Sequence, residues 1–535
     1  MPNETSIDTS SLLTILGLIA AVWAIVPTAT RLRFKLSVTW FEWLVVVGVF
    51  LAVHYLVFEP TLRSVGLYHS FGPWKWGLDK SSSIYLLLLG LGLFILVRAR
   101  APKLARRNIG VFAKLVNNLL LTKRYDELVS LVEPQFSKLL NISRYRPLLA
   151  RAAAKMAPRS ALDLEAILSG VRPKHENHLK HWFRSALTRL ESTLAGWDSP
   201  ADQAQELLRG LSNSPSLVTH LAVAYPDFGL RIILEWPEVV REDFVELFMD
   251  ALLSDNSSRL YVELKSNENL SGRHRLALPP TNRILYFFFR DVSVAAHHGL
   301  YRAIGESVRR RLDEDPKLVE AYNRSLGYFA EVGKYHSPVY AGIKLFEIMI
   351  HEGIHQGQQD HLWLFYFTHF TDGILEQMRD VAPDDGNHEF PTPFHYLLYQ
   401  IVSIASNWID DCLEVDVAAI AKDVTEKPDF DAYYIPEKAT DALGTIVQSI
   451  ISSPKIDDRF KRYMLEVALS QYKRIKNTPR VTTVARSFIK SLINGLDLPT
   501  RPAYRHELHR VFGQLDHVLR HEIPEFAQAL EDARQ

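Results

Sequence analysis

Cysteine is almost absent from this sequence of 535 residues, which contains only Cys412. A single thiol excludes an intrachain disulfide framework and a zinc site built from several thiolates. An excess of charge of either sign is also missing, because 61 Lys and Arg balance 61 Asp and Glu. This balance argues against a strongly basic nucleic-acid-binding protein, so no nucleic-acid partner is expected. The sequence also lacks the phosphate-binding, nucleophile-elbow and paired-cysteine motifs of common enzymes.

Three long apolar runs stand near the N-terminus, at residues 11–28, 40–58 and 81–97. A helix needs about 20 residues to cross a hydrocarbon core of about 30 Å. The second run is therefore long enough, whereas the first and third are marginal by themselves. We predict a transmembrane domain of residues 1–100 with three membrane-spanning helices. A cleaved signal peptide is a poor alternative, because the residues before the first run contain two acidic residues and no Lys or Arg.

Basic residues are distributed unequally around the three runs, with eight on one side of the expected membrane and three on the other. Because basic residues favour the cytoplasmic side, we expect the N-terminus outside and the long C-terminal part in the cytoplasm. This topology predicts a multi-pass protein of an inner (plasma) membrane, with the lipid bilayer as a partner. The residues expected at the membrane interfaces are Trp40, Trp43, Trp74, Trp76, Arg98, Arg100, Arg106 and Arg107.

The remainder of the chain shows apolar residues at helical spacing and few alternating strand patterns. We predict a mainly α fold, in which three transmembrane helices precede a large cytoplasmic, solenoid-like helical region. Polar stretches rich in Gly and Pro divide this region into predicted domains at residues 101–270, 283–425 and 439–535. The most strand-like run, residues 284–294, fits a buried helix equally well.

Two helix starts have clear sequence signals. Asp315 and Ser337 are each followed by a proline, a pattern typical of an N-cap residue and the first helical position. The first signal predicts a helix that begins at Pro316 and ends at Gly333. The second predicts a helix that begins at Pro338 and continues through the next apolar segment.

One chemical motif occurs in that segment, the HExxH formed by His351, Glu352 and His355. In zinc peptidases with this motif, the two histidines lie one helical turn apart and bind the metal, while the glutamate activates a water molecule. The third ligand must come from elsewhere: His361 and Glu376 are the main candidates, and Asp372 and His369 are further options. The motif therefore predicts a zinc site with Glu352 as the catalytic base.

An ordinary amphipathic helix is the competing interpretation of the same residues. Tyr340, Lys344, Glu347, His351 and His355 fall on one face of a helix, and apolar residues cover the rest. Such a stripe is typical of a solvated helix surface. We favour this interpretation over the metal site, so no cofactor is favoured and zinc belongs to the alternative.

The function that we favour is that of a membrane-anchored protein with a cytoplasmic helical body that binds a protein partner or another copy of itself. Its role would be binding, regulation or sensing. The first alternative is a membrane-tethered zinc metallopeptidase that uses His351, Glu352 and His355. The second alternative is an oligomeric membrane pore gated by the cytoplasmic domain. Whether the protein is an enzyme is left open by the sequence.

Overall fold

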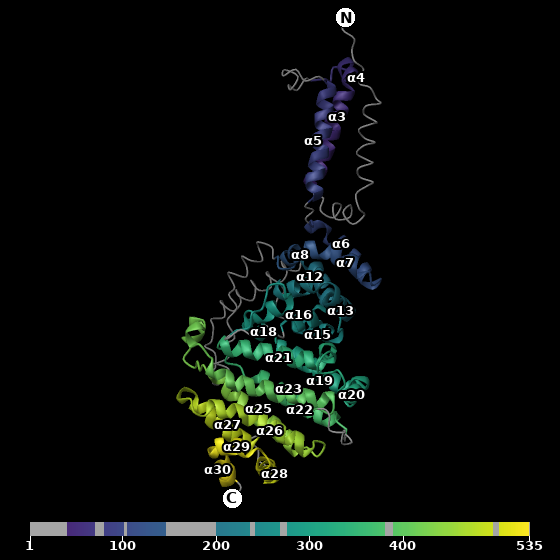
Figure 1. The fold of residues 1–535 in the computed structure, drawn as a ribbon. Coiled ribbons are helices and arrows are strands. Elements are labelled where there is room, and N and C mark those ends of the chain that lie inside the picture. The colour runs from purple at the N-terminus through teal and green to yellow at the C-terminus, as the bar shows by residue number, and fades with distance from the viewer. Residues whose placement is uncertain are drawn as a thin grey trace, which may run out of the picture. The chain divides into compact units, whose positions relative to one another are not determined.

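The computed structural model describes residues 40–69, 80–100, 104–145, 199–235, 241–267, 275–379, 389–495 and 502–533. The regular elements within these ranges are all helices, and none of the described residues forms a strand (Figure 1). The prediction of a mainly α fold is therefore confirmed. The chain divides into two compact units, Met1–Ser212 and Asn213–Gln535. The three predicted helical domains stay predictions.

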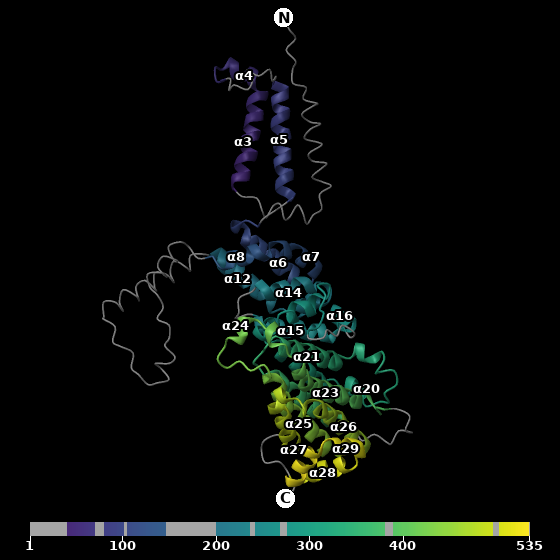
Figure 2. The same cartoon turned by 60° about the vertical axis from the view of Figure 1, so that its left-hand side comes forward.

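The first unit contains two long helices, α3 (Trp40–Val57) and α5 (Lys80–Arg100), which lie side by side (Figure 2). Val53, Leu56, Ile84 and Leu88 form the small buried cluster between them. The short helix α4 (Glu59–Ser64) follows α3. Among the described residues, α3 is the helix that is by itself long and apolar enough to cross a membrane.

The prediction of three membrane spans is supported for one of them. Residues 11–28 lie outside the described part of the chain. Residues 81–97 form most of α5, but the apolar stretch of that helix, Ser81–Ile95, is shorter than a full span. Within the described ranges, the helix Trp40–Val57, which covers nearly all of the predicted span at 40–58, combines sufficient length with sufficient apolar character. One span is weak support for membrane association, so the predicted multi-pass topology stays a prediction.

The structure describes some of the residues predicted at the membrane interfaces and leaves others outside its described ranges. Trp40 and Trp43 lie in the first turn of α3 and are 66% and 58% exposed, and their interfacial position stays a prediction. Trp74 and Trp76 lie outside the described residues. Arg98 and Arg100 end α5, and Arg107 follows Arg106 in the 3₁₀ turn η2 (Arg106–Asn108). The Arg106 guanidinium lies 3.8 Å from the centre of the Tyr145 ring, so its charge is at least partly used within the protein.

The first unit also contains a small group of helices with a buried apolar interior. Its members are α6 (Ile109–Leu121), α7 (Tyr125–Val132), η3 (Glu133–Gln135), α8 (Phe136–Ser143) and α12 (Ser199–Ser212). Helix α12 packs against both α6 and α8. Phe112 of α6 and Phe136 of α8 are fully buried, which fits the helical spacing of apolar residues in this part of the sequence.

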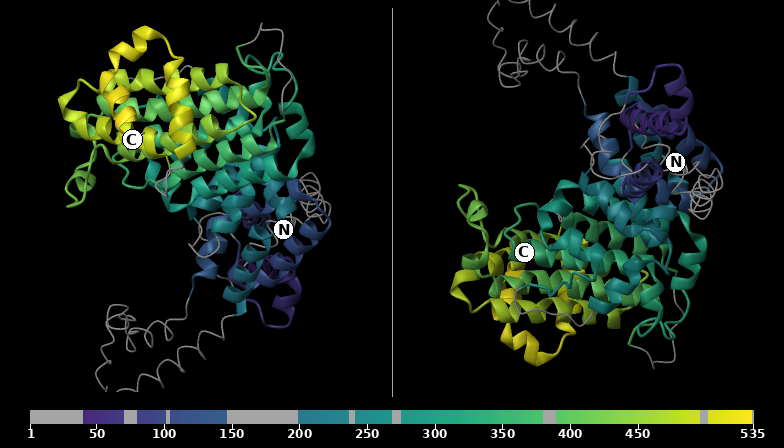
Figure 3. Two further views of the ribbon diagram at one scale, coloured as in Figure 1. Left: turned by 90° about the horizontal axis from the view of Figure 1, so that it is seen from below. Right: turned by 90° about the horizontal axis from the view of Figure 1, so that it is seen from above.

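The helices of the second unit stack in two rows. The first row consists of α15 (Arg241–Ser254), α19 (Leu300–Glu314), α22 (Phe365–Gln377), α25 (Tyr434–Ser452) and α27 (Thr482–Asn494). The second row consists of α16 (Arg259–Asn267), α21 (Pro338–His355), α23 (Pro393–Asp410), α26 (Asp458–Ile475) and α28 (Pro502–Gly513). Each helix packs against the next one in its own row and against at least one helix of the other row (Figure 3). Every helix pair therefore buries its apolar face on its neighbours.

Shorter elements connect and cap these rows. They are α13 (Pro215–Ala224), α14 (Pro226–Glu235), α17 (Arg283–Phe289), α18 (Val292–His297), α20 (Pro316–Tyr322), η5 (Gly333–His336), η6 (Leu362–Leu364), η7 (Asp411–Leu413), η8 (Val417–Ala419), α24 (Lys422–Thr425), η9 (Pro479–Val481), α29 (His517–Glu522) and α30 (Pro524–Asp532). The run at residues 284–294 thus forms helices and no strand. The Asp291 side chain caps α18 by accepting a hydrogen bond from the Ser293 amide at 3.0 Å.

Both predicted helix starts are confirmed, but one predicted helix end is wrong. The Asp315 carboxylate accepts hydrogen bonds from the amides two and three residues later, and the Ser337 hydroxyl accepts one from the amide three residues later. The helix that begins at Pro316 ends at Tyr322 instead of Gly333. Four residues after this end, the Leu326 amide donates to the Pro391 carbonyl at 3.1 Å, a contact that local sequence does not encode.

A buried aromatic cluster fixes the relative positions of α21, α22 and α23. Phe346 of α21 contacts Phe367 and Phe370 of α22, with ring centres 6.0 and 5.6 Å apart. Trp408 of α23 lies 4.5 Å from the Phe367 ring centre. All four side chains are at most 1% exposed. This packing brings the end of α21 close to the end of α23, where the candidate site lies.

Candidate functional site

The HExxH motif occupies the end of helix α21. The helix begins after the Ser337 cap and ends at His355, so His351 and His355 lie one turn apart. Their ring centres are 4.6 Å apart in an edge-to-face arrangement. The motif therefore has the helical geometry that metal binding by two histidines requires.

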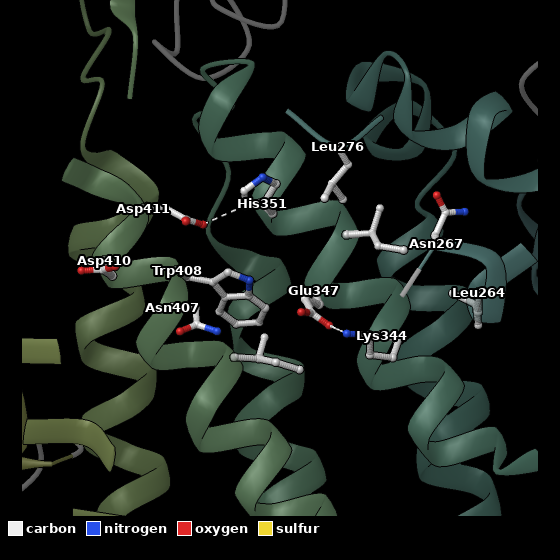
Figure 4. Close-up of a pocket in the computed structure, with 12 residues that line it drawn as sticks. Leu264, Asn267, Leu276, Lys344, Glu347, His351, Asn407, Trp408, Asp410 and Asp411 are labelled. Atoms are coloured by element: carbon white, nitrogen blue, oxygen red, sulfur yellow. Dashed lines mark hydrogen bonds and ion pairs between the residues drawn. The ribbon is translucent and has the colours of Figure 1, made fainter. Parts of the chain in front are cut away.

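Asp411 completes a group that the sequence analysis did not foresee. It is the first residue of η7, directly after α23, and its Oδ2 lies 2.9 Å from His351 Nδ1 (Figure 4). His351, His355 and Asp411 each offer one ligand atom, and these atoms all lie within 4.8 Å of one another. The group could therefore hold a metal ion. The available sequence signal was an acidic pair at the end of an amphipathic helix, which by itself is common.

The two predicted third ligands lie elsewhere. His361 Nδ1 is 2.8 Å from the Tyr434 hydroxyl of α25, and its ring packs against Phe365. Glu376 is exposed near the end of α22. The turn after α21 passes through Gly357, whose positive φ of 72° redirects the chain. Neither His361 nor Glu376 belongs to the group formed by His351 and His355.

Glu352, the predicted catalytic base, is fully buried and fully engaged. Its Oε2 accepts hydrogen bonds from Arg275 Nε at 2.8 Å and from Gln356 Nε2 at 2.9 Å. Its Oε1 accepts one from the Leu276 amide at 2.7 Å. A general base in a metallopeptidase must reach the metal-bound water. In this structure, Glu352 instead fastens the segment at residues 275–276 to helix α21.

The surroundings of His351 favour a positive charge. Burial lowers the pKa of His351, but the hydrogen bond and charge of Asp411, together with the charges of Glu352 and Glu347, outweigh this effect and raise the pKa above its usual value. For the neighbouring Asp410, burial raises the pKa, and the Arg474 guanidinium at 2.6 Å opposes that effect. The site is therefore an acidic environment around a histidine pair.

A cavity of about 260 Å³ lies beside His351 and Asp411 (Figure 4). Helix α21 contributes Lys344 and Glu347, which form an ion pair one to two turns before His351. Helix α23 contributes Trp408, whose buried Nε1 has no hydrogen-bond partner within the described ranges. The cavity therefore combines charged groups with a free donor, which suits water or a small polar ligand.

No known family matches this chain. No curated protein and no solved structure matches it. Its function is therefore inferred from the residues and geometry described above.

Proposed function

We propose that the chain is a membrane-anchored protein whose second unit, Asn213–Gln535, is a helical binding module with a regulatory or sensing role. The observation that carries this proposal is the stack of paired helices in two rows. Stacked helix pairs expose long continuous surfaces, and such surfaces are typically used to bind partners. The partner would be another protein or a second copy of the chain.

Helix α3 supports the membrane anchor. Most of its 18 residues are apolar, with Glu42 and His54 as the ionisable exceptions, and few of them are buried within the described structure. Phe41, Leu44 and Leu51 are each more than half exposed. Burial of such side chains in lipid stabilises the anchored state by about 25 cal/mol per Å² of apolar surface. We propose that α3, α5 and residues 11–28 all cross a plasma membrane, with the N-terminus outside and the second unit in the cytoplasm.

An exposed aromatic segment supports the binding of a protein partner. Between α20 and η5, Tyr328 is 84% exposed and Val332 is 57% exposed. These two side chains are four residues apart, and the Val332 amide donates to the Tyr328 carbonyl at 3.0 Å. Tyrosines on protruding segments are enriched in protein interfaces, because they bury a large area with few rotatable bonds.

The zinc metallopeptidase is the second candidate, because His351, His355 and Asp411 could hold its metal. Two observations give it less support than the binding module. Both oxygens of Glu352 are already engaged by protein donors. In addition, no strand occurs among the described residues to align an extended substrate. The gated-pore alternative draws no specific support from the described part of the chain.

Topology is testable by cysteine labelling, because Cys412 is the only cysteine and is buried. In a Cys412→Ser background, Ser6→Cys and Asn256→Cys place one thiol in the N-terminal segment and one in the exposed turn between α15 and α16. A membrane-impermeant maleimide should label Ser6→Cys in intact cells and Asn256→Cys only after permeabilisation. Labelling of Asn256→Cys in intact cells, or release of the chain by alkaline carbonate, would contradict the proposed anchor.

Partner binding is testable by site-specific photocrosslinking in the native membrane. A photoreactive phenylalanine at Tyr328 should give a discrete adduct with a partner or a second copy. The control is the same residue at Lys490, which is exposed on α27, a helix whose described residues include no exposed aromatic. Adducts that are no stronger at Tyr328 than at Lys490 would count against a binding surface at this segment.

A further inference from the structure

We infer that His351, His355 and Asp411 bind a divalent transition-metal ion, such as zinc, that holds the end of α21 against η7. This role is non-catalytic, and it does not depend on the proposed membrane anchor or protein partner. The ligands come from two elements that the helical stack brings together, because Asp411 lies 56 residues after His355 in the sequence.

The geometry is close to that of a bound ion. With metal–ligand bonds of about 2.0–2.2 Å, the ligand atoms of a tetrahedral site lie about 3.3 Å apart. His351 Nδ1 and Asp411 Oδ2 are 2.9 Å apart, and all three ligand atoms lie within 4.8 Å of one another. His355 reaches the same point because it follows His351 by one turn on a rigid helix. Small side-chain rotations are enough to close the site.

The His351 ring retains unused coordinating capacity. Its Nε2 is buried and has no hydrogen-bond partner in the described part of the chain. Buried polar atoms in native proteins nearly always have a partner, so an unpaired nitrogen on a ring that also contacts Asp411 calls for an explanation. A metal ion bound through Nδ1 beside Asp411 would fix the tautomer of this ring and leave Nε2 as its N–H donor, the role that the second nitrogen of a metal-bound histidine normally has.

The charges around the group also favour a cation. Glu347 is paired with Lys344, Asp410 with Arg474, and Glu352 with Arg275. Asp411, by contrast, has no Lys or Arg partner among the described residues, and its ion-pair partner is His351. Its negative charge therefore faces the histidine pair and no fixed cation of Lys or Arg, and a divalent ion bound there would take the place of the proton on His351.

The ligand chemistry limits the metal. Two imidazoles and one carboxylate suit zinc, cobalt, manganese, nickel or ferrous iron, whereas calcium and magnesium prefer oxygen ligands alone. The cavity of about 260 Å³ that His351 and Asp411 line provides space for water as a remaining ligand. Because Glu352 is engaged by Arg275 and Leu276, the ion would act as a clamp between two helix ends, not as the centre of hydrolysis.

Cobalt titration of the purified, metal-stripped, full-length chain in detergent tests this inference directly. Wild type should bind one Co²⁺ per chain with the intense visible absorption of a tetrahedral ion, and Zn²⁺ should displace it. We expect Asp411→Asn and His355→Ala each to weaken binding by tenfold or more. His361→Ala is the matched control, because it removes a nearby histidine that is outside the group, and it should bind like wild type.

Zinc should also raise the thermal unfolding midpoint of wild type and of His361→Ala, but not that of Asp411→Asn, because an ion that binds only the folded chain stabilises it. Asp411→Asn nearly preserves the shape of the side chain, so circular dichroism should show an intact fold. Absence of stoichiometric cobalt binding by wild type would overturn the inference. Equal binding by Asp411→Asn and wild type, or an equal loss in His361→Ala, would do so too.

Discussion

Replacement of Glu352 by alanine distinguishes a structural carboxylate from a catalytic one. The side chain is fully buried and accepts hydrogen bonds from Arg275, Leu276 and Gln356. Its removal leaves the Arg275 guanidinium without this carboxylate and the Leu276 amide without its acceptor. The segment at residues 275–276 would then lose its attachment to α21.

The expected loss of stability in Glu352→Ala follows from the burial of the Glu352 and Arg275 charges. Removal of one partner from a buried ion pair costs about 3–5 kcal/mol. The Arg275 side chain is 46% exposed, so water can solvate part of its charge, and we expect the lower end, about 3 kcal/mol. For a unit of this size, 1 kcal/mol corresponds to roughly 2 °C, so the unfolding midpoint should fall by roughly 6 °C. Glu352→Gln keeps an oxygen that can accept from the Leu276 amide, so its loss of stability should be about half that of Glu352→Ala.

The assay is thermal unfolding of the full-length chain in detergent, combined with hydrogen exchange in the peptide that contains Leu276. Faster exchange at Leu276 should accompany the lower midpoint of Glu352→Ala. Glu347→Gln is the control, because this half-buried glutamate is paired only with Lys344 in the described structure and should cost less than about 1 kcal/mol. A Glu352→Ala variant that unfolds and exchanges like wild type would refute the structural role.

Two further predictions concern the helical stack. Burial lowers the pKa of His395 from 6.5 to about 4. Between these values the unfolded chain binds more protons than the folded chain, so the contribution of neutral His395 to the free energy of unfolding is complete above pH 6.5 and is lost as the pH falls through 4. At about 1.4 kcal/mol per pH unit the loss approaches 3 kcal/mol. Urea unfolding between pH 4 and 7 should show a shallower acid loss in His395→Gln, and an unchanged slope would contradict this assignment. At Gly444, an added Cβ would lie 2.3 Å from the Ser491 carbonyl oxygen, so Gly444→Ala should separate α25 from α27 and cost about 1–3 kcal/mol in a calorimetric scan. Gly373→Ala, whose nearest neighbour is at 3.4 Å, should stay within about 1 kcal/mol of wild type, and equal effects at the two glycines would argue against the close packing.

Features that depend on residues close together in the sequence could be predicted from the sequence. The helices after Asp315 and Ser337 begin where the sequence predicts, because an N-cap bond joins groups two or three residues apart. The pairing of His351 with His355 is equally local, since residues four apart on a helix share a face. The apolar character of α3 is also a property of a single segment.

Features that depend on distant residues were decided by the tertiary structure. The helix after Pro316 ends at Tyr322, and the chain beyond it bonds to Pro391 through Leu326. Residues 284–294 belong to two short helices although their local pattern was ambiguous. The role of Glu352 depends on Arg275, which lies 77 residues earlier.

The third member of the candidate metal group shows the same limit. Spacing in a sequence translates into distance only within one rigid element, so it could pair His351 with His355 and nothing beyond them. His361 is the closer choice along the chain, yet the turn at Gly357 takes it to Tyr434. Asp411 reaches His351 because buried aromatic rings pack α23 against α21 and α22. The sequence therefore determined the helices and the histidine pair, and the packing between helices determined which carboxylate meets them.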